Sequence, residues 1–265
     1  MADTALIGYT GFVGQNLARQ RPFDGLFNRQ NLTQLAGTHW RRLVICGLPA
    51  EKWRANQAPE ADLQNMQRLQ QGLAQTRADQ VILVSTVDVY ARPVEVDEHT
   101  PIESGSQSPY GRHRHAFEQW AMARFADCRI LRLPGLFGGG LKKNVLFDLL
   151  HDHQVEQIRA DASFQWYPLA RLADDIDRLV AADLHLANAA TAPVLTGDLA
   201  HEFFPGLRAR LRAGGDGAPP RYDMRSCHAP IFGGGQGYWM SAAAVTRAVG
   251  DWLAGEPGWE APHGR

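Results

Sequence analysis

The sequence predicts an α/β protein with a doubly wound parallel sheet, followed by a smaller C-terminal region. Two observations lead to this fold class. Short apolar runs alternate with segments of helical periodicity over roughly the first 140 residues, and a glycine-rich turn joins the first run to the first helical segment. Strands that alternate with helices indicate βαβ units, which build a parallel sheet with helices on both of its faces.

The expected elements follow one another in a regular order. The apolar runs typical of strands are residues 6–7, 25–27, 43–46, 81–84 and 130–133. The segments with helical periodicity are residues 13–19, 62–75 and 109–126. A further helix, over about residues 172–188, is expected to return to the main sheet. From about Gly138 the chain is richer in glycine and proline, which favours loops and short elements.

Composition narrows the function classes. The chain has 265 residues and a formal net charge of −1, so it has no general basic character for nucleic acid or for a membrane surface. The three cysteines, Cys46, Cys128 and Cys227, are far apart and read as reduced thiols. No charged segment precedes the first strand and no apolar run approaches the length of a membrane span. We therefore expect a cytoplasmic protein with a small-molecule substrate and without a nucleic-acid or membrane partner.

Three glycines at three-residue spacing, Gly8, Gly11 and Gly14, separate the first apolar run from the first helical segment. Glycine allows a tight turn and a close approach of the backbone to a ligand. The first turn of a helix leaves N–H groups without partners and carries the positive end of the helix dipole, so a phosphate or pyrophosphate is the natural ligand there. An ordinary strand-turn-helix is the alternative. A P-loop is excluded because no Gly-Lys-Ser/Thr follows.

A second group of polar residues follows the strand at residues 81–84. Ser85 and Thr86 come directly after it, at the end of a parallel strand where open α/β sheets place ligands. Tyr110 and Arg114 lie one helical turn apart on a later helix and share one face of it. A hydroxyl, a phenol and a cation can therefore converge.

Four segments together resemble the extended short-chain dehydrogenases/reductases, in the NAD-dependent epimerase/dehydratase family. Residues 8–14 resemble the dinucleotide loop, and residues 85–90 resemble the active-site strand end. Residues 110–114 resemble the Tyr-x-x-x-Lys helix, and residues 131–138 resemble the segment that passes under the nicotinamide. The resemblance covers roughly the first 140 residues, and it implies a Rossmann fold.

The resemblance implies three catalytic residues. Tyr110 would be the general acid/base, and Thr86 would hold the same substrate oxygen by a hydrogen bond. Arg114 stands where the family has lysine, and its charge would stabilise the Tyr110 phenolate. Arginine is bulkier than lysine and presents its donors differently, so the exchange alters a tight site.

The resemblance also implies a nicotinamide cofactor. The residues expected to bind it are Gly8, Thr10, Gly11, Phe12, Val13, Gly14, Asn28, Arg29, Cys46, Gly47, Leu48, Ser85, Tyr110, Arg114, Pro134 and Leu136. The second strand ends without an acidic residue, and Arg29 tilts the expectation to NADP, with NAD as the alternative. A surface arginine that points at solvent is the other interpretation of Arg29.

The substrate expected from the resemblance is a sugar or a nucleotide sugar. Its candidate contacts are Asp88, Lys143, Asn144 and Arg171. Residues 1–137, with the returning helix, would form the dinucleotide-binding domain, and residues 138–171 and 196–265 the small substrate-binding region. A non-catalytic NADP-binding sensor and a small carbonyl reductase are the alternatives.

Two further expectations concern metals and assembly. His113 and His115, and likewise His151 and His153, are two residues apart and so on different faces of a helix, which favours solvated or substrate-edge histidines over a metal site. A homodimer through the helices at 62–75 and 109–126 is the assembly that the resemblance implies.

Overall fold

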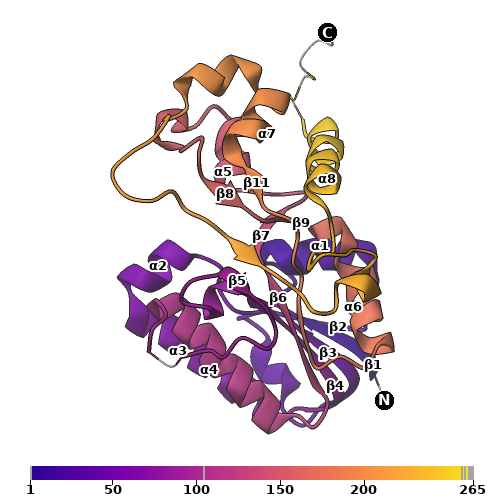
Figure 1. Ribbon diagram of the computed structural model, residues 1–265. Coiled ribbons are helices and arrows are strands. Elements are labelled where there is room, and N and C mark those ends of the chain that lie inside the picture. Colours follow the sequence, from indigo (N-terminus) through magenta and orange to yellow (C-terminus); the bar gives the residue numbers. More distant parts are fainter. Residues whose placement is uncertain (1, 104, 258, 260, 262–265) are drawn as a thin grey trace. The chain divides into compact units, whose positions relative to one another are not determined.

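The computed structural model describes residues 2–103, 105–257, 259 and 261 (Figure 1). The contacts between Cα atoms divide the chain into two compact units. The first consists of Met1–Arg92, Glu98–Leu133 and Ala170–Asn188, and the second of Pro93–Asp97, Pro134–Leu169 and Ala189–Arg265. Of the expected C-terminal region, residues 258, 260 and 262–265 lie outside the described part.

A six-stranded parallel sheet is the centre of the first unit, with strand order β10-β6-β4-β3-β1-β2. Its strands are β1 (Ala2–Ile7), β2 (Gly25–Phe27), β3 (His39–Ile45), β4 (Arg77–Thr86), β6 (Cys128–Leu133) and β10 (Leu186–Asn188). The chain passes from β1 to β2 on one side and then crosses to β3 on the other, so the strand order reverses between β1 and β3. Open α/β sheets bind ligands at the carboxyl ends of the strands beside such a reversal.

Helices cover both faces of this sheet (Figure 1). They are α1 (Phe12–Gln20), α2 (Lys52–Gln57), α3 (Pro59–Leu73), α4 (Pro109–Arg124) and α6 (Leu172–Ala181), with short 3-10 turns η1 (Leu32–Leu35) and η2 (Val87–Val89). Alternate strand residues face alternate sides. Ile7 and Leu83 belong to one buried cluster with Met66 of α3 and Phe117 of α4. Helices α1 and α6 pack together on the other face.

The predicted doubly wound sheet is confirmed, and each expected strand of the first 140 residues is present. The expected helix at 172–188 was too long. Helix α6 ends at Ala181, Asp183 takes a left-handed conformation with φ 53°, and residues 186–188 form β10 instead. The reason is a long-range pairing, because Leu186 lies opposite Ile130 of β6 at the edge of the sheet.

The second unit holds short elements around a separate core. Its strands are β5 (Val94–Val96), β7 (Gly135–Phe137), β8 (Ser163–Phe164), β9 (Trp166–Pro168), β11 (Val194–Leu195) and β12 (Asp223–Met224), which pair as β11-β8, β12-β5 and β7-β9. Its helices are α5 (Val145–Leu150), α7 (Thr196–Phe203) and α8 (Ala242–Ala254). Their apolar faces meet in one cluster that includes Leu146, Leu199 and Val249. This unit also takes in residues 93–97, which the expected boundaries assigned to the first region.

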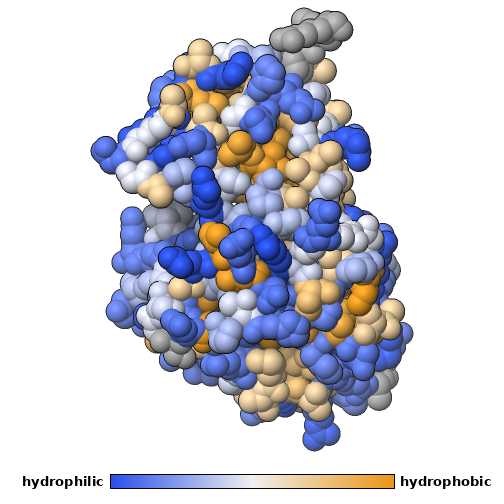
Figure 2. Space-filling view, in the orientation of Figure 1, coloured by the Kyte–Doolittle hydropathy of each residue, from blue (hydrophilic) through white to orange (hydrophobic). Residues whose placement is uncertain are grey.

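The surface mixes polar and apolar residues. Hydrophilic and apolar residues are interspersed on the face drawn in Figure 2. In the first unit the large apolar side chains that are exposed, Leu26, Trp53 and Met122, belong to three different elements. Single exposed apolar residues are ordinary on a folded chain. Within the described residues, every helix is too short or too polar to cross a membrane.

Candidate functional site

The glycine turn after β1 is built from close backbone contacts. Gly8 has φ 86°, and a Cβ added to it would lie 2.5 Å from the carbonyl oxygen of Cys46. Its N–H donates to the carbonyl of Phe27 at 2.7 Å, so the turn is tied to the ends of both neighbouring strands. A side chain is therefore excluded at Gly8 by conformation and by space.

A side chain is also excluded at Gly14, near the start of α1. Gly14 faces the turn, and a Cβ there would overlap the carbonyl of Gly8. Gly11 is the N-cap of the helix, and Gln15 donates the helix's first backbone bond to the carbonyl of Gly11. The N–H groups of Phe12, Val13 and Gly14 precede that bond and belong to the unsatisfied first turn. This turn lies at the carboxyl end of β1, where the strand order reverses.

The residues expected beside this turn end the neighbouring strands. After β2, the N–H of Asn28 donates to Asn31 Oδ1 at 2.7 Å, and Arg29 is exposed. After β3, a Cβ on Gly47 would lie 2.9 Å from Ile7, and Leu48 packs against the core. Burial raises the pKa of the Cys46 thiol to about 12, so this cysteine is a packing residue rather than a nucleophile.

Helix α4 begins in a way that fixes Tyr110. Ser108 is the N-cap and Pro109 the first helical residue, an order that favours helix initiation. A Cβ on Gly111 would overlap the carbonyl of Asp88, so the first turn of α4 rests directly on η2. The Tyr110 phenol is thereby brought beside the side chain of Thr86, which acts on its pKa. The structure thus brings Tyr110 and Thr86 together, as expected for the first two catalytic residues.

The environment of Tyr110 favours the protonated phenol. The side chain is buried, and this desolvation raises the pKa of Tyr110 above its usual value. The charge of Arg114 and the hydrogen bond with Thr86 lower the pKa, while the carboxylates of Asp88 and Asp62 raise it, and the net shift is upward.

Arg114 is present beside Tyr110, but it is bound to a carboxylate. Its guanidinium lies over the ring of Tyr110, with Cζ 4.2 Å from the ring centroid. Nη1 and Nη2 donate to the two oxygens of Asp62 at 2.7 and 2.9 Å, and Nη2 also donates to the carbonyl of Pro49. Burial raises the pKa of Asp62, but the hydrogen bonds from Arg114 and His113 outweigh it, and the pKa falls below its usual value.

His113 is not solvated, which was one of the two environments expected for it. The residue is only 7% exposed, and its Nδ1 lies 2.8 Å from Oδ2 of Asp62. The pairing with Asp62 could not be predicted, because spacing along one helix carries no information about a carboxylate on another helix. His151 and His153, by contrast, are exposed.

A second buried network lies behind Ser85, and the sequence analysis missed it. The hydroxyl of Ser85 lies 2.5 Å from Oε1 of Glu118, a fully buried residue of α4. Arg132 of β6 donates to both oxygens of Glu118, at 3.0 and 2.6 Å, and to the hydroxyl of Tyr90 at 2.8 Å. The available signal was the spacing, since Glu118 is one turn beyond Arg114 on the same helix face.

The four expected substrate contacts are spread over both units. In the first unit, Asp88 pairs with Lys52 at 2.6 Å, and Arg171 pairs with Asp175 at 3.1 Å. In the second unit, Lys143 is exposed, and Asn144 caps α5 by accepting from the N–H of Phe147 at 3.0 Å. The amide nitrogen of Asn144 donates to the carbonyl of Leu136 at 2.9 Å, so both ends of this side chain have structural partners.

The other residues predicted to bind the cofactor also belong to both units. Thr10 is exposed in the glycine turn of the first unit. Pro134 is buried and Leu136 lies in β7, and both belong to the second unit.

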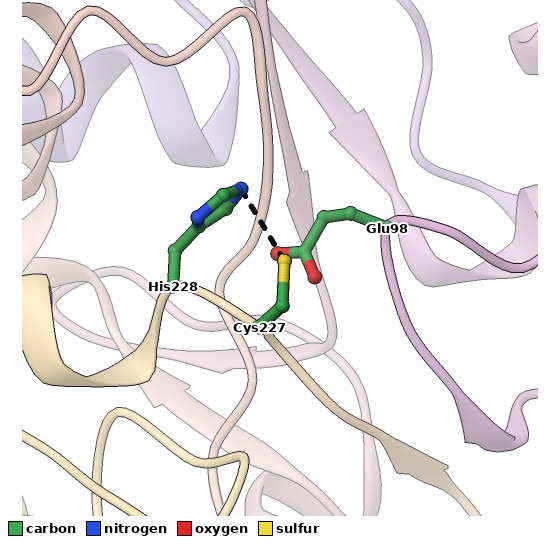
Figure 3. A group of neighbouring side chains, drawn as sticks. All are labelled: Glu98, Cys227 and His228. Carbon is green, nitrogen blue, oxygen red and sulfur yellow. Dashed lines mark hydrogen bonds between the residues drawn. The ribbon is translucent and has the colours of Figure 1, made fainter.

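The second unit also carries the one exposed cysteine. Figure 3 shows the imidazole of His228 beside the thiol of Cys227, with Sγ 3.5 Å from Nε2. Cys128, by contrast, is buried, and burial raises the pKa of its thiol to about 12. Among the three cysteines, Cys227 is therefore the most exposed.

Comparisons with known proteins agree on the fold. No protein-family model and no curated protein matches the sequence. The structure of dTDP-4-dehydrorhamnose reductase from Bacillus anthracis, in complex with NADP, matches with a TM-score of 0.71 and 15% identity, over 97% of this chain and 99% of that one. The structure of dTDP-glucose 4,6-dehydratase from Streptomyces venezuelae, with NAD bound, matches with a TM-score of 0.70 and 16% identity, over 97% and 98%. A UDP-galactose 4-epimerase matches with a TM-score of 0.70 and 15% identity, over 96% and 99%. The chain therefore has the fold of the extended short-chain dehydrogenases/reductases.

Proposed function

We propose that this protein is a nicotinamide-dependent enzyme that acts on a sugar or a sugar nucleotide. The observation that carries the proposal is the placement of the Tyr110 phenol beside the hydroxyl of Thr86 at the carboxyl end of β4, close enough for Thr86 to shift the pKa of Tyr110. Two hydroxyls at this edge of a parallel sheet can hold one substrate oxygen and exchange a proton with it. The substrate class is supported by the solved structures with this fold, which are named for dTDP- and UDP-linked sugars.

The glycine turn fits a dinucleotide. Gly8 and Gly14 leave a backbone cradle that a Cβ would fill, and the unsatisfied N–H groups of α1 begin directly behind it. Phe12, Val13 and Gly14 would donate to the pyrophosphate, and residues 46–48 would line the adenine side. When bound, a nicotinamide supplies the acceptor or donor of hydride.

Arg29 favours NADP over NAD. It is exposed just after β2, the place where a basic residue accommodates the 2′-phosphate. A guanidinium binds a phosphate through charge-assisted hydrogen bonds. Both cofactors occur among the similar structures, with NADP in the reductase and NAD in the dehydratase.

Tyr110 and the side chains around it would transfer the proton and hold the substrate. Since the pKa of Tyr110 is raised, the phenol starts protonated and can give its proton to a substrate oxygen. Thr86 would hold that oxygen by a hydrogen bond. Asp88, Lys143, Asn144 and Arg171 remain candidates for contacts with the rest of the substrate.

The experiment compares Tyr110→Phe with the wild type on a panel of dTDP- and UDP-sugars, with NADPH or NADH present and products identified by mass spectrometry. Loss of the proton donor is expected to lower kcat at least about 100-fold. The matched control is Thr38→Val, which removes a hydroxyl that donates to the carbonyl of Leu35 at the amino end of β3 and should leave turnover nearly unchanged. Conversion by Tyr110→Phe at the wild-type rate would contradict the role of Tyr110.

A further inference from the structure

A buried ionic cluster stands beside the candidate site, and the proposed function leaves its carboxylate without a role. The cluster consists of Asp62 at the start of α3 and of His113 and Arg114 on α4. All three side chains are at most 9% exposed. Burial of ionised groups is unfavourable unless they are paired and hydrogen-bonded in good geometry.

The geometry of the cluster fixes the orientation of Arg114. The planar guanidinium presents two parallel donors, and the carboxylate of Asp62 accepts both, at 2.7 and 2.9 Å. Nη2 has a second acceptor in the carbonyl of Pro49. The plane held in this way lies over the ring of Tyr110, with Cζ 4.2 Å from the ring centroid. Asp62 therefore decides where the positive charge sits relative to Tyr110.

Several other polar and charged groups lie around Tyr110. On η2, Asp88 contributes a negative charge that is paired with Lys52 of α2 at 2.6 Å. Thr86 contributes a hydroxyl, and Asn56 of α2 accepts the backbone N–H of Tyr110 at 3.0 Å. His113 is turned to Asp62. Among these groups, Arg114 is the cation that lies against the Tyr110 ring, where its charge would stabilise a phenolate. Asp62 offsets that charge.

We propose that Asp62 is a positioning residue of this site, which clamps Arg114 flat against the Tyr110 ring and offsets its charge. The catalytic meaning of this inference rests on the proposed function, because Tyr110 affects turnover only if it touches the substrate. The arrangement also explains how arginine is accommodated at the position of the expected lysine: α3 supplies the acceptor that matches the guanidinium fork.

The test measures the ionisation of Tyr110 directly, without cofactor or substrate. The protein is labelled with 3-fluorotyrosine, whose more acidic phenol brings the titration into a milder pH range, and is followed by ¹⁹F NMR. The chain has six tyrosines, and Tyr110→Phe identifies the resonance of interest. Because the readout needs no turnover, a failure of this inference is distinguishable from a failure of the proposed function.

Asp62→Asn keeps the shape of the side chain and removes its charge. The unbalanced guanidinium should stabilise the phenolate and lower the pKa of Tyr110 by about one unit or more. The same substitution in an Arg114→Gln background should produce less than half of that shift, because Asp62 acts through Arg114. A purely structural role would destabilise the fold without moving this titration. No shift, or an equal shift in the two backgrounds, overturns the inference.

A second variant keeps the test decisive if Asp62→Asn does not fold. In Arg114→Lys the carboxylate should capture the ammonium, so the pKa of Tyr110 should stay within about half a unit of the wild type. A fall in the pKa of Tyr110 by about one unit or more would mean that the ammonium does not pair with Asp62, and it would overturn the inference. The control is Asp177→Asn, which breaks another arginine–carboxylate pair, with Arg21, on the opposite face of the sheet. It should leave the Tyr110 titration in place.

Discussion

At the residue scale, Gly8 shows why the first turn requires glycine. Its backbone is left-handed, with φ 86°, and the carbonyl of Cys46 occupies the space that a Cβ needs. Gly37 is a matched position, with φ 76° and no atom within 4 Å of its would-be Cβ. The two glycines therefore separate the effect of conformation from the effect of close approach.

Gly8→Ala should lower the free energy of unfolding by at least about 2 kcal/mol, because backbone strain and overlap add. Gly37→Ala should lower it by about 1 kcal/mol, since only the left-handed conformation is unfavourable there. Urea unfolding of the two variants measures the difference. Equal losses would show that the approach of Cys46 imposes no constraint.

Local sequence patterns placed some residues of the candidate site on their elements, but they did not indicate others. Tyr110 and Arg114 are one turn apart on one helix, and Ser85 and Thr86 directly follow a strand, so local rules were enough to place them. Asp62 lies 52 residues before Arg114 on another helix. No local pattern indicates that pairing, which exists only because α3 and α4 pack together.

At the scale of the element, α4 determines the geometry of the site. Its first turn rests on η2 at Gly111, where a Cβ would overlap the carbonyl of Asp88. Any side chain there must push α4 away from the strand end that carries Thr86. The contact therefore couples the stability of the unit to the placement of Tyr110 beside Thr86.

Gly111→Ala should destabilise the protein by about 1–3 kcal/mol, although alanine normally favours a helix. The change in unfolding free energy is measured by urea denaturation. Gly206→Ala is the control, because a Cβ at Gly206 meets no atom within 4 Å. A Gly111→Ala variant as stable as the wild type would show that α4 can shift without loss.

The C-terminal end of α6 shows where hydrophobic periodicity led to a wrong prediction. The apolar residues from 184 to 187 continue a helical pattern, but a left-handed turn at Asp183 ends the helix and the segment joins the sheet as β10. Pairing with β6 decides the outcome, and no local rule contains that information. Helices α1, α3 and α4 match their predicted bounds to within about three residues, whereas no helix was predicted at the position of the short α2.

At the scale of the whole molecule, the alternation of strands and helices was sufficient for the fold class. The strand order, and therefore the reversal between β1 and β3, required the structure, because it depends on which edges pair. The second unit was expected only as loops and short elements, and its small two-stranded pairings have no repeating pattern to predict them. A homodimer through α3 and α4 stays a prediction.

The central claim is that this fold holds a nicotinamide dinucleotide on the bare first turn of α1. The most direct measurement is a fluorescence titration of the purified protein with NADPH and NADH, for the wild type and for Arg29→Ala. We predict micromolar binding of NADPH, about tenfold weaker in Arg29→Ala, since one phosphate contact contributes about 1.4 kcal/mol. NADH binding should be the same in both proteins. Absence of micromolar binding by either nucleotide would contradict the account, and the glycine turn would then be a purely structural feature of the fold.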